Sequence, residues 1–384
     1  MKKLASFVRE PMVLLFVGAL LLVSVLDVIF SDKPFSEVEN RELAQRPTLT
    51  VEGLFDLSFG KEYDEYLADQ FVGRDGWITL KSLLWTATGR TENNGILYGK
   101  DGYLFEKMFE YDEEKFERNL GYLEKFAQSC PSPLTLVMIP NSFAVYPEKL
   151  PAGAAQVDQA SVIEDVYARF SDYAGCVDLL APLRESDTPY LYYRTDHHWT
   201  TDGAYIGYEA LCRSLGLTPA GRSAFERREV PDFYGTYYSK CKKAGQQPDT
   251  IVWYPIPDVE MTVRAVTREG EFYTTDYDTL YNEAQFAEYD KYAAFLYSNN
   301  DLTVIRNNAP SPEAAGKSIC VIKDSYGNSL IPFLTQNYET VAVVDVRYFN
   351  GSLSEYLTES AFDQVVVMYN FSTFTTENIA RISY

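Results

Sequence analysis

The most regular hydrophobic pattern in this chain is a series of short apolar runs that alternate with segments of helical spacing. The runs are rich in valine, isoleucine and leucine and predict strands at residues 134–139, 176–180, 318–323, 341–346 and 364–369. Between them, apolar residues at helical spacing predict helices, among them 116–126, 162–173 and 201–215. Continuous β-branched strands that alternate with helices are typical of a buried parallel sheet with helices on both faces. We therefore expect an α/β fold.

Three further segments have patterns of their own. Residues 55–84 carry apolar residues at helical spacing, and residues 95–105 (GILYGKDGYLF) predict a hairpin because a turn-forming group separates two short apolar runs. Residues 219–315 interrupt the alternation of strands and helices and are rich in tyrosine, charge and turn residues. We expect this last stretch to be an insertion of strands and loops.

The longest apolar run lies near the N-terminus, at residues 12–30, and is about long enough to cross a bilayer as a helix. Basic residues precede it and acidic residues follow it, which predicts a cytoplasmic N-terminus. A cleaved signal peptide is the alternative, but the run is long for one and no small-residue cleavage site follows. We therefore expect a single-pass membrane anchor at 1–32 and an extracytoplasmic domain at 33–384.

Composition narrows the classes of partner. The formal net charge is −21, so nucleic acid and anionic lipid surfaces would be repelled. Thirty tyrosines suit sugar-binding clefts and protein interfaces as well as ordinary packing. The five cysteines show no metal-type spacing, and a disulfide between Cys130 and Cys176 is one arrangement that the predicted strands allow. We expect no cofactor.

Both histidines of the chain, His197 and His198, lie in the string Asp196-His-His-Trp199. Histidine is the side chain that most often carries a proton at neutral pH in catalysis, so this string is a candidate site. A polar turn before the helix at 201–215 is the simpler interpretation. A metal site is disfavoured, because adjacent histidines rarely chelate one ion and no other histidine completes a ligand set.

A second candidate lies where the strand at 318–323 ends in Asp324-Ser325. Parallel α/β sheets place ligands at the carboxyl ends of their strands, beside the following helix N-termini. The backbone amide of Ser325 and the helix dipole would then be available to a developing oxyanion. Ser325 as a simple helix N-cap is the alternative.

The two candidates together favour a nucleophilic site. A serine needs an adjacent imidazole, which a carboxylate in turn holds in one tautomer. We expect His198 to take the Ser325 proton and Asp196 to bond the other ring nitrogen, because their i, i+2 spacing puts them on one side of an extended loop. His197 is the competing base, and we expect it to point to the opposite side.

These motifs resemble the SGNH hydrolase superfamily and, more closely, the DHHW family and its relatives that O-acetylate alginate. The resemblance covers most of residues 36–384. It rests on the entry Glu39-Asn40-Arg41, the segment 69–75, the turn 99–105, Asp196-His-His-Trp199 and Lys323-Asp-Ser-Tyr326.

The order of the motifs is reversed relative to ordinary SGNH enzymes, and a circular permutation of a flavodoxin-like sheet explains this. The strand before Ser325 then becomes the first of the family, 341–346 the second and 364–369 the third. The resemblance implies an oxyanion-hole glycine after the second strand and an asparagine after the third. Those positions, and the other residues that flank the predicted site, give the oxyanion and substrate candidates Asn370, Gly351, Arg347, Tyr348, Asn141, His197, Trp199 and Tyr326.

The resemblance implies an enzyme that transfers an acyl group, such as acetyl, through Ser325 to a cell-surface polysaccharide or exopolysaccharide. Its implied partner is an acyl donor of the membrane-bound O-acyltransferase class. A carbohydrate esterase with the same triad is one alternative, since both reactions share the first half. A non-catalytic glycan-binding or assembly protein is another.

Overall fold

The computed structural model describes residues 11–36, 41–266 and 271–384. The chain divides into two compact units. The first consists of residues 1–90 with 242–245, and the second of residues 91–241 with 246–384. Each unit is described by itself.

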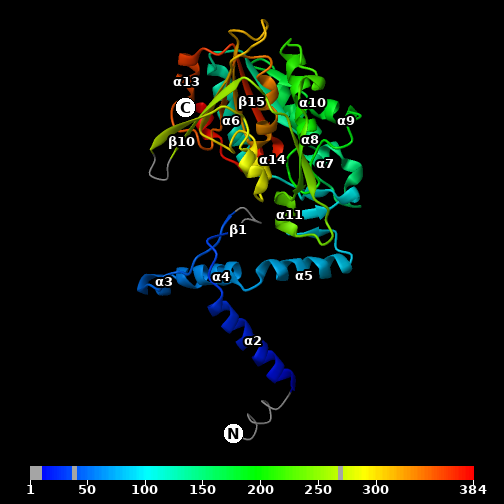
Figure 1. Cartoon of the computed structure of the whole chain (residues 1–384), viewed down its shortest axis with the longest axis vertical. Coiled ribbons are helices and arrows are strands. Elements are labelled where there is room, and N and C mark those ends of the chain that lie inside the picture. Colours follow the sequence, from blue (N-terminus) through cyan, green and yellow to red (C-terminus); the bar gives the residue numbers. More distant parts are fainter. Residues whose placement is uncertain (1–10, 37–40, 267–270) are drawn as a thin grey trace. The chain divides into compact units, whose positions relative to one another are not determined.

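The first unit is helical. Its elements are α2 (Pro11–Ile29), α3 (Val51–Phe55), α4 (Ser58–Gln70), α5 (Arg74–Ala87) and the short strand pair β1 (Phe35–Ser36) and β2 (Arg41–Glu42) (Figure 1). Asp69 near the end of α4 accepts hydrogen bonds from Arg41 at 2.5 and 2.8 Å and from the Ala44 amide at 2.9 Å. These bonds hold the pKa of Asp69 at about 2, well below its usual value.

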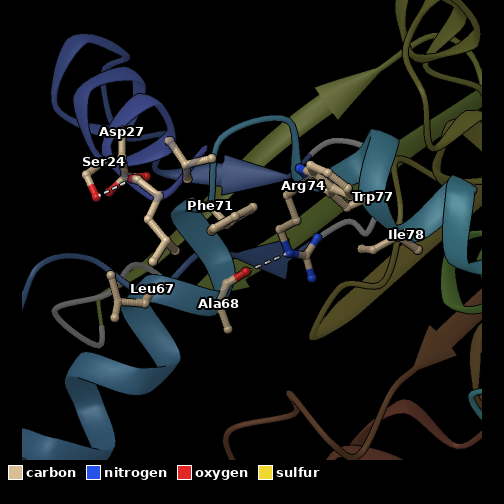
Figure 2. A pocket seen from close by; sticks show the side chains of 10 residues that line it. Ser24, Asp27, Leu67, Ala68, Phe71, Arg74, Trp77 and Ile78 are labelled. Atoms are coloured by element: carbon tan, nitrogen blue, oxygen red, sulfur yellow. Dashed lines mark hydrogen bonds between the residues drawn. The ribbon is translucent and has the colours of Figure 1, made fainter. Parts of the chain in front are cut away.

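This unit has a hollow with a volume of about 700 Å³. Figure 2 shows the side chains that line it. Its lining comes from α2, α4 and α5 and is mostly apolar. On one side of it the Arg74 Nε donates to the Ala68 carbonyl at 3.1 Å, which ties the start of α5 to α4.

The predicted membrane span at 12–30 is wrong. In the three stretches that the structure describes, no helix combines the length and the apolar character needed to cross a bilayer. The single-pass localisation predicted from that run is wrong for the same reason.

The second unit is built on one eight-stranded sheet with the order β11-β10-β12-β14-β13-β15-β6-β7. The strands are β6 (Leu134–Ile139), β7 (Gly175–Val177), β10 (Val259–Val266), β11 (Phe272–Tyr277), β12 (Leu302–Asn307), β13 (Ser318–Lys323), β14 (Thr340–Val344) and β15 (Gln364–Asn370). The five strands from β14 to β7 are parallel. If β13 is counted as the first strand, then β14 is the second, β15 the third, β6 the fourth and β7 the fifth. The order across this part of the sheet is therefore 2-1-3-4-5.

The predicted fold class, a parallel sheet with helices on both faces and an N-terminal transmembrane helix, is wrong in two respects: the sheet is mixed, although mostly parallel, and none of the helices described is long and apolar enough to cross a membrane. The insertion contributes β10, β11 and β12, and all three pair antiparallel, with β12 against β14. Antiparallel strands can leave one face to solvent, and the residues of β11 are mostly exposed. Their sequences therefore lack the continuous apolar runs that marked the parallel strands.

Helices complete the second unit. They are α6 (Glu113–Ser129), α7 (Ser142–Val145), α8 (Gln159–Phe170), α9 (Leu180–Glu185), α10 (Thr201–Ser214), α11 (Thr236–Cys241), α12 (Ile331–Leu334), α13 (Leu353–Ser360) and α14 (Phe371–Thr376). Asp112 caps the N-terminus of α6, and Thr200 caps that of α10. The predicted helices at 116–126, 162–173 and 201–215 correspond to α6, α8 and α10.

Smaller elements connect these layers. The predicted hairpin is present as β4 (Ile96–Tyr98) and β5 (Leu104–Glu106), and β3 (Glu92–Asn93) pairs with the other edge of β4. In addition, β8 (Arg228–Phe233) pairs with β9 (Asp249–Trp253). Short 3-10 helices are η1 (Lys100–Gly102), η2 (Pro147–Lys149), η3 (Arg222–Ala224), η4 (Glu283–Ala287), η5 (Lys291–Ala294), η6 (Ser325–Ser329) and η7 (Ala380–Ser383). All five cysteines are free thiols, including Cys130 and Cys176.

Candidate active site

The turn after β13 presents Ser325. Asp324 caps η6 by accepting the Tyr326 amide at 3.0 Å, and its second oxygen accepts the Asn370 amide at 2.8 Å. Asp324, not Ser325, is therefore the N-cap, and the Ser325 hydroxyl is left for another partner. The element that follows is a five-residue 3-10 helix, so a helix dipole contributes less here than expected.

The loop that carries the histidines is fastened to this turn by Trp199. The indole Nε1 of Trp199 donates to the Tyr326 carbonyl at 2.9 Å and to the Ser329 hydroxyl at 3.0 Å. Trp199 is completely buried and forms a β-bridge with Tyr192. The structure therefore places Trp199 in the core, where it sets the distance between two loops that are 127 residues apart in the sequence.

Asp196, His198 and Ser325 form a continuous hydrogen-bonded chain. His198 Nε2 lies 2.8 Å from Ser325 Oγ, and His198 Nδ1 lies 2.6 Å from Asp196 Oδ1. The same carboxylate oxygen accepts the His198 backbone amide at 3.0 Å. In this arrangement the carboxylate fixes both the loop and the ring, so Nε2 faces the hydroxyl as an acceptor.

The second oxygen of Asp196 is held by α11. Asp196 Oδ2 accepts the Thr236 amide at 2.7 Å and the Thr236 hydroxyl at 3.1 Å. Burial would raise the pKa of Asp196, but the two histidines and the hydrogen bonds from the His198 side chain and backbone outweigh burial and lower the pKa below its usual value. The carboxylate is therefore ionised at neutral pH.

The extended-loop argument predicted that His197 points away from His198. It does not. The two ring centroids lie 3.8 Å apart, because the Asp196 side chain accepts the His198 amide and turns the backbone. His197 Nδ1 lies 2.6 Å from the Thr236 hydroxyl. Burial and the neighbouring His198 lower the pKa of His197 to about 4, so this ring is neutral at pH 7.

Tyr292 covers the His198 ring. The two rings stack with their centroids 3.8 Å apart and an interplanar angle of 14°. The Tyr292 hydroxyl lies 3.1 Å from both the Ser325 carbonyl oxygen and the Ser329 hydroxyl. Tyr292 therefore contacts the base and the turn that carries the nucleophile.

The predicted oxyanion donor Asn370 has other partners. Its Nδ2 donates to the Ile139 carbonyl at 3.0 Å, and its Oδ1 accepts the Ser372 amide at 3.0 Å. The side chain thus links β15 to β6 and caps α14. Asn141 is buried at the end of β6, but its side chain makes no cap to α7.

The other candidates lie in the loop after β14 and in the Ser325 turn. Arg347 pairs with Asp345 through two contacts, at 2.9 and 2.6 Å. Tyr348 is half exposed, and Gly351 has a φ of 149°. Tyr326 is buried and donates its hydroxyl to the His197 carbonyl.

Sequence reasoning missed three residues that support this site. Thr236 and Tyr292 come from the irregular insertion, and Asp249 begins β9. Asp249 accepts the Thr195 amide at 2.7 Å and the Thr195 hydroxyl at 2.6 Å, which holds the start of the histidine loop. No sequence motif marks these three residues.

The same residues are a poor fit for a metal ion. Ligand atoms of Asp196, His197 and His198 do lie within 4.8 Å of one another. However, both ring nitrogens of His198 and the Nδ1 of His197 already have hydrogen-bond partners. Binding an ion there would break the chain to Ser325.

Comparison with known proteins decides the family. The model of the DHHW protein family matches residues 148–344, which is more than half of the chain and includes both Asp196 and Ser325. The chain belongs to the DHHW family. This confirms the resemblance drawn from the four-residue string.

Curated relatives of this DHHW protein match over part of their length. It is 28% identical over 163 residues to the probable alginate O-acetylase AlgJ of Pseudomonas fluorescens, which covers 40% of each chain. It is 26% identical over 196 residues to the protein of the same name from Pseudomonas putida, which covers 44% of this chain and 49% of the relative. The chain thus spans between two fifths and half of these relatives.

Solved structures show the same fold. A DHHW family protein from Eubacterium siraeum is 22% identical, covers 76% of this chain and 95% of its own, and gives a TM-score of 0.61. Bacillus cereus PatB1 is 18% identical, covers 74% of this chain and 98% of its own, and gives a TM-score of 0.60.

Proposed function

We propose that this DHHW protein is an O-acyltransferase that moves an acyl group, most simply acetyl, to a hydroxyl of a polysaccharide through Ser325. The observation that carries the proposal is the hydrogen-bonded chain from Asp196 through His198 to Ser325. It lies at the carboxyl end of β13, where parallel sheets bind ligands.

The first half-reaction acylates the serine. His198 Nε2 takes the Ser325 proton while Oγ attacks the carbonyl carbon of the acyl donor. The tetrahedral intermediate collapses when the bond to the donor's leaving group breaks, and His198 returns the proton to that group. Asp196 stabilises the imidazolium in between. The backbone N–H of Ser325 is the oxyanion donor that we propose.

The second half-reaction repeats these steps with a sugar hydroxyl. His198 takes the hydroxyl proton, the sugar oxygen attacks the acyl carbon, and the ester bond to Ser325 Oγ breaks. The proton then passes from Nε2 to Oγ, which restores the free serine. An esterase differs only in using water at this stage.

A polysaccharide acceptor is supported by the curated relatives, which are named alginate O-acetylases. The donor class that we propose, a membrane-bound O-acyltransferase, is the one that the family resemblance implies.

The test is a product analysis with an activated acetyl ester as donor and an oligosaccharide in excess as acceptor. We expect acetylated oligosaccharide as the main product, and we expect Ser325→Ala to remove it. Ser318→Ala is the matched control, because this serine lies at the other end of β13 and bonds Asp363. Free acetate as the main product despite excess acceptor would indicate an esterase. Activity that persists in Ser325→Ala would refute catalysis by this serine.

A further inference from the structure

One nitrogen of the His197 ring has no role in the hydrogen-bonded chain to Ser325. Its Nδ1 lies 2.6 Å from the Thr236 hydroxyl, whereas its Nε2 has no hydrogen-bond partner among the residues that the structure describes. Nor is this nitrogen one of the buried polar atoms that lack a partner, and the His197 side chain is 31% exposed against 7% for His198. The Nε2 of His197 is therefore open to solvent beside the base.

The hydrogen bonds around Asp196 decide which nitrogen of His197 carries the proton. The Thr236 hydroxyl has one hydrogen, which it donates to Asp196 Oδ2 at 3.1 Å. Its oxygen is then left to accept a hydrogen bond from His197 Nδ1. In a neutral imidazole one nitrogen is a donor and the other an acceptor. We therefore assign a lone pair and no proton to His197 Nε2, which makes it a hydrogen-bond acceptor.

The two histidine rings turn the same edge to one carboxylate. His198 Nδ1 lies 2.6 Å from Asp196 Oδ1, and His197 Nδ1 lies 3.6 Å from Asp196 Oδ2. In each ring the lone pair of Nε2 lies in the ring plane and points away from the Nδ1 edge. Both Nε2 atoms therefore lie on the side of the ring pair away from the carboxylate, which for His198 is the side of Ser325 Oγ.

Two adjacent acceptors of this kind suit two neighbouring hydroxyls of a sugar ring. In the second half-reaction His198 Nε2 takes the proton of the attacking hydroxyl. Oxygens on adjacent ring carbons lie about one hydrogen-bond length apart, about 3 Å, which is comparable with the 3.8 Å between the centroids of the two imidazoles. A hydroxyl on the neighbouring carbon can therefore donate to His197 Nε2 while the first is held at His198.

We propose that His197 is a binding residue that selects a vicinal diol as the acceptor, and the inference rests on the function proposed above. Its Nε2 accepts a hydrogen bond from the hydroxyl next to the one that becomes acylated. The attacking sugar oxygen bonds the acyl carbon, the bond to Ser325 Oγ breaks, and the proton passes through His198 Nε2 to Oγ. The neighbouring hydroxyl keeps its proton throughout.

The test is a competition between two acceptors for one acyl-enzyme, with an activated acetyl ester as donor. Methyl glucoside is mixed with the monodeoxy analogue that lacks the hydroxyl next to the acetylated position. The product ratio equals the ratio of the two kcat/KM values, so it does not depend on how much acyl-enzyme forms. We expect the wild type to favour the intact sugar by about three- to tenfold, the effect of one neutral hydrogen bond.

Variants of His197 show whether this ring causes the preference. His197→Asn can keep a donor near the Thr236 hydroxyl but has no atom at the position of Nε2, so we expect the preference to fall to near one. His197→Gln reaches that position with an amide oxygen, and we expect it to restore part of the preference.

Tyr237→Phe is the matched control. The Tyr237 ring lies 6.2 Å from that of His197, and its hydroxyl has no hydrogen-bond partner within the part of the chain that the structure describes. We expect this variant to keep the preference of the wild type.

An equal preference in the wild type and in His197→Asn would overturn the role of His197. Acetylation of the primary hydroxyl by the wild type would do the same, because the adjacent carbon there carries no hydroxyl. The comparison of acceptors in the wild type needs no variant, so the inference can fail even if His197→Asn does not fold. Failure of the wild type to acetylate either sugar is a different result, and it would overturn the proposed function itself.

Discussion

At the scale of single residues, the central group is the carboxylate of Asp196. One oxygen holds His198 through two nitrogens, and the other holds Thr236 through its amide and hydroxyl. Every contact is to a donor, so the ionised form is the one that the site stabilises. Asp196 thus orients the base and also joins the insertion to the loop that carries the histidines.

Replacing Asp196 with asparagine tests this orientation. The amide can present the wrong group to His198 Nδ1 and select the wrong tautomer, so we expect acylation of Ser325 to slow by roughly a thousandfold or more. The burst of leaving group from an activated acetyl ester measures this rate. Asp202→Asn is the matched control, since Asp202 lies six residues on and pairs with Arg222. A near-normal burst in Asp196→Asn would contradict the account.

Gly235 leaves room for the same carboxylate. A Cβ at this position would lie 2.2 Å from the Asp196 Cβ and 2.3 Å from its Oδ2, closer than atoms can approach. We expect Gly235→Ala to displace Asp196, slow acylation, and lower the free energy of unfolding by about 1–3 kcal/mol. Urea unfolding and the acetyl-ester burst measure the two effects. Gly121→Ala is the control, because a Cβ at this helix position would have nothing within 4 Å. We expect it to lower neither the rate of acylation nor the free energy of unfolding.

Sequence reasoning brought together Asp196, His198 and Ser325 because each lies in a short motif with a chemical meaning. It missed Thr236 and Tyr292 because their partners lie 40 and 33 residues away and their own surroundings have no regular pattern. The stacked position of His197 was also missed. It depends on a side-chain-to-backbone hydrogen bond within the loop, which spacing alone does not reveal.

At the scale of elements, β13 is the strand that places the nucleophile, and it ends in a buried lysine. Lys323 Nζ donates to Asn299 at 3.0 Å and lies 3.9 Å from Asp345. Burial lowers the pKa of Lys323 to about 8, although Asp345 opposes the shift. Lys323 therefore releases its proton at a lower pH in the folded state than in the unfolded state.

This difference predicts how stability depends on pH. An unfolded lysine binds its proton up to about pH 10.5. Between about pH 8 and that value the unfolded chain therefore holds more protons, and stability rises with pH. We expect Lys323→Met to remove up to about 3 kcal/mol of this rise, as measured by urea unfolding across the window. An equal rise in the variant would show that Lys323 does not carry it.

The sequence predicted best those elements whose hydrophobic pattern is strong and regular. The five parallel strands have continuous apolar runs because both of their faces are buried, and β13 is an example. The strand β7 is shorter than predicted because α9 begins at Leu180. The edge strand β11 and its neighbour β10 were not assigned to the main sheet, since half-exposed antiparallel strands resemble loops in composition.

At the scale of the whole molecule, the net charge of −21 bears on the choice of acceptor in the proposed transfer. A polyanionic sugar chain is repelled at low salt, and added salt screens the repulsion. We expect the apparent KM for an anionic oligosaccharide to fall several-fold between about 0.01 and 0.15 M salt. A neutral oligosaccharide should show no such change. A KM for the anionic acceptor that rises with salt would indicate a local basic binding surface.

The whole-molecule predictions from sequence were correct for the family and wrong in two other respects. The family follows from the string at Asp196–Trp199, which is short and specific. The membrane span was inferred from the length and apolar composition of residues 12–30 and from the charges that flank them, and no described helix meets the requirement for crossing a bilayer. The mixed sheet was missed because strand direction depends on contacts between the insertion and β14.

The most direct measurement of the central claim is covalent labelling with a serine-directed acylating or sulfonylating probe, followed by peptide mapping. The account predicts one adduct, on Ser325, that forms rapidly in the wild type and is absent in His198→Ala. Labelling of Ser325 at the same rate in both proteins, or labelling of a different residue, would contradict the claim that His198 activates this serine.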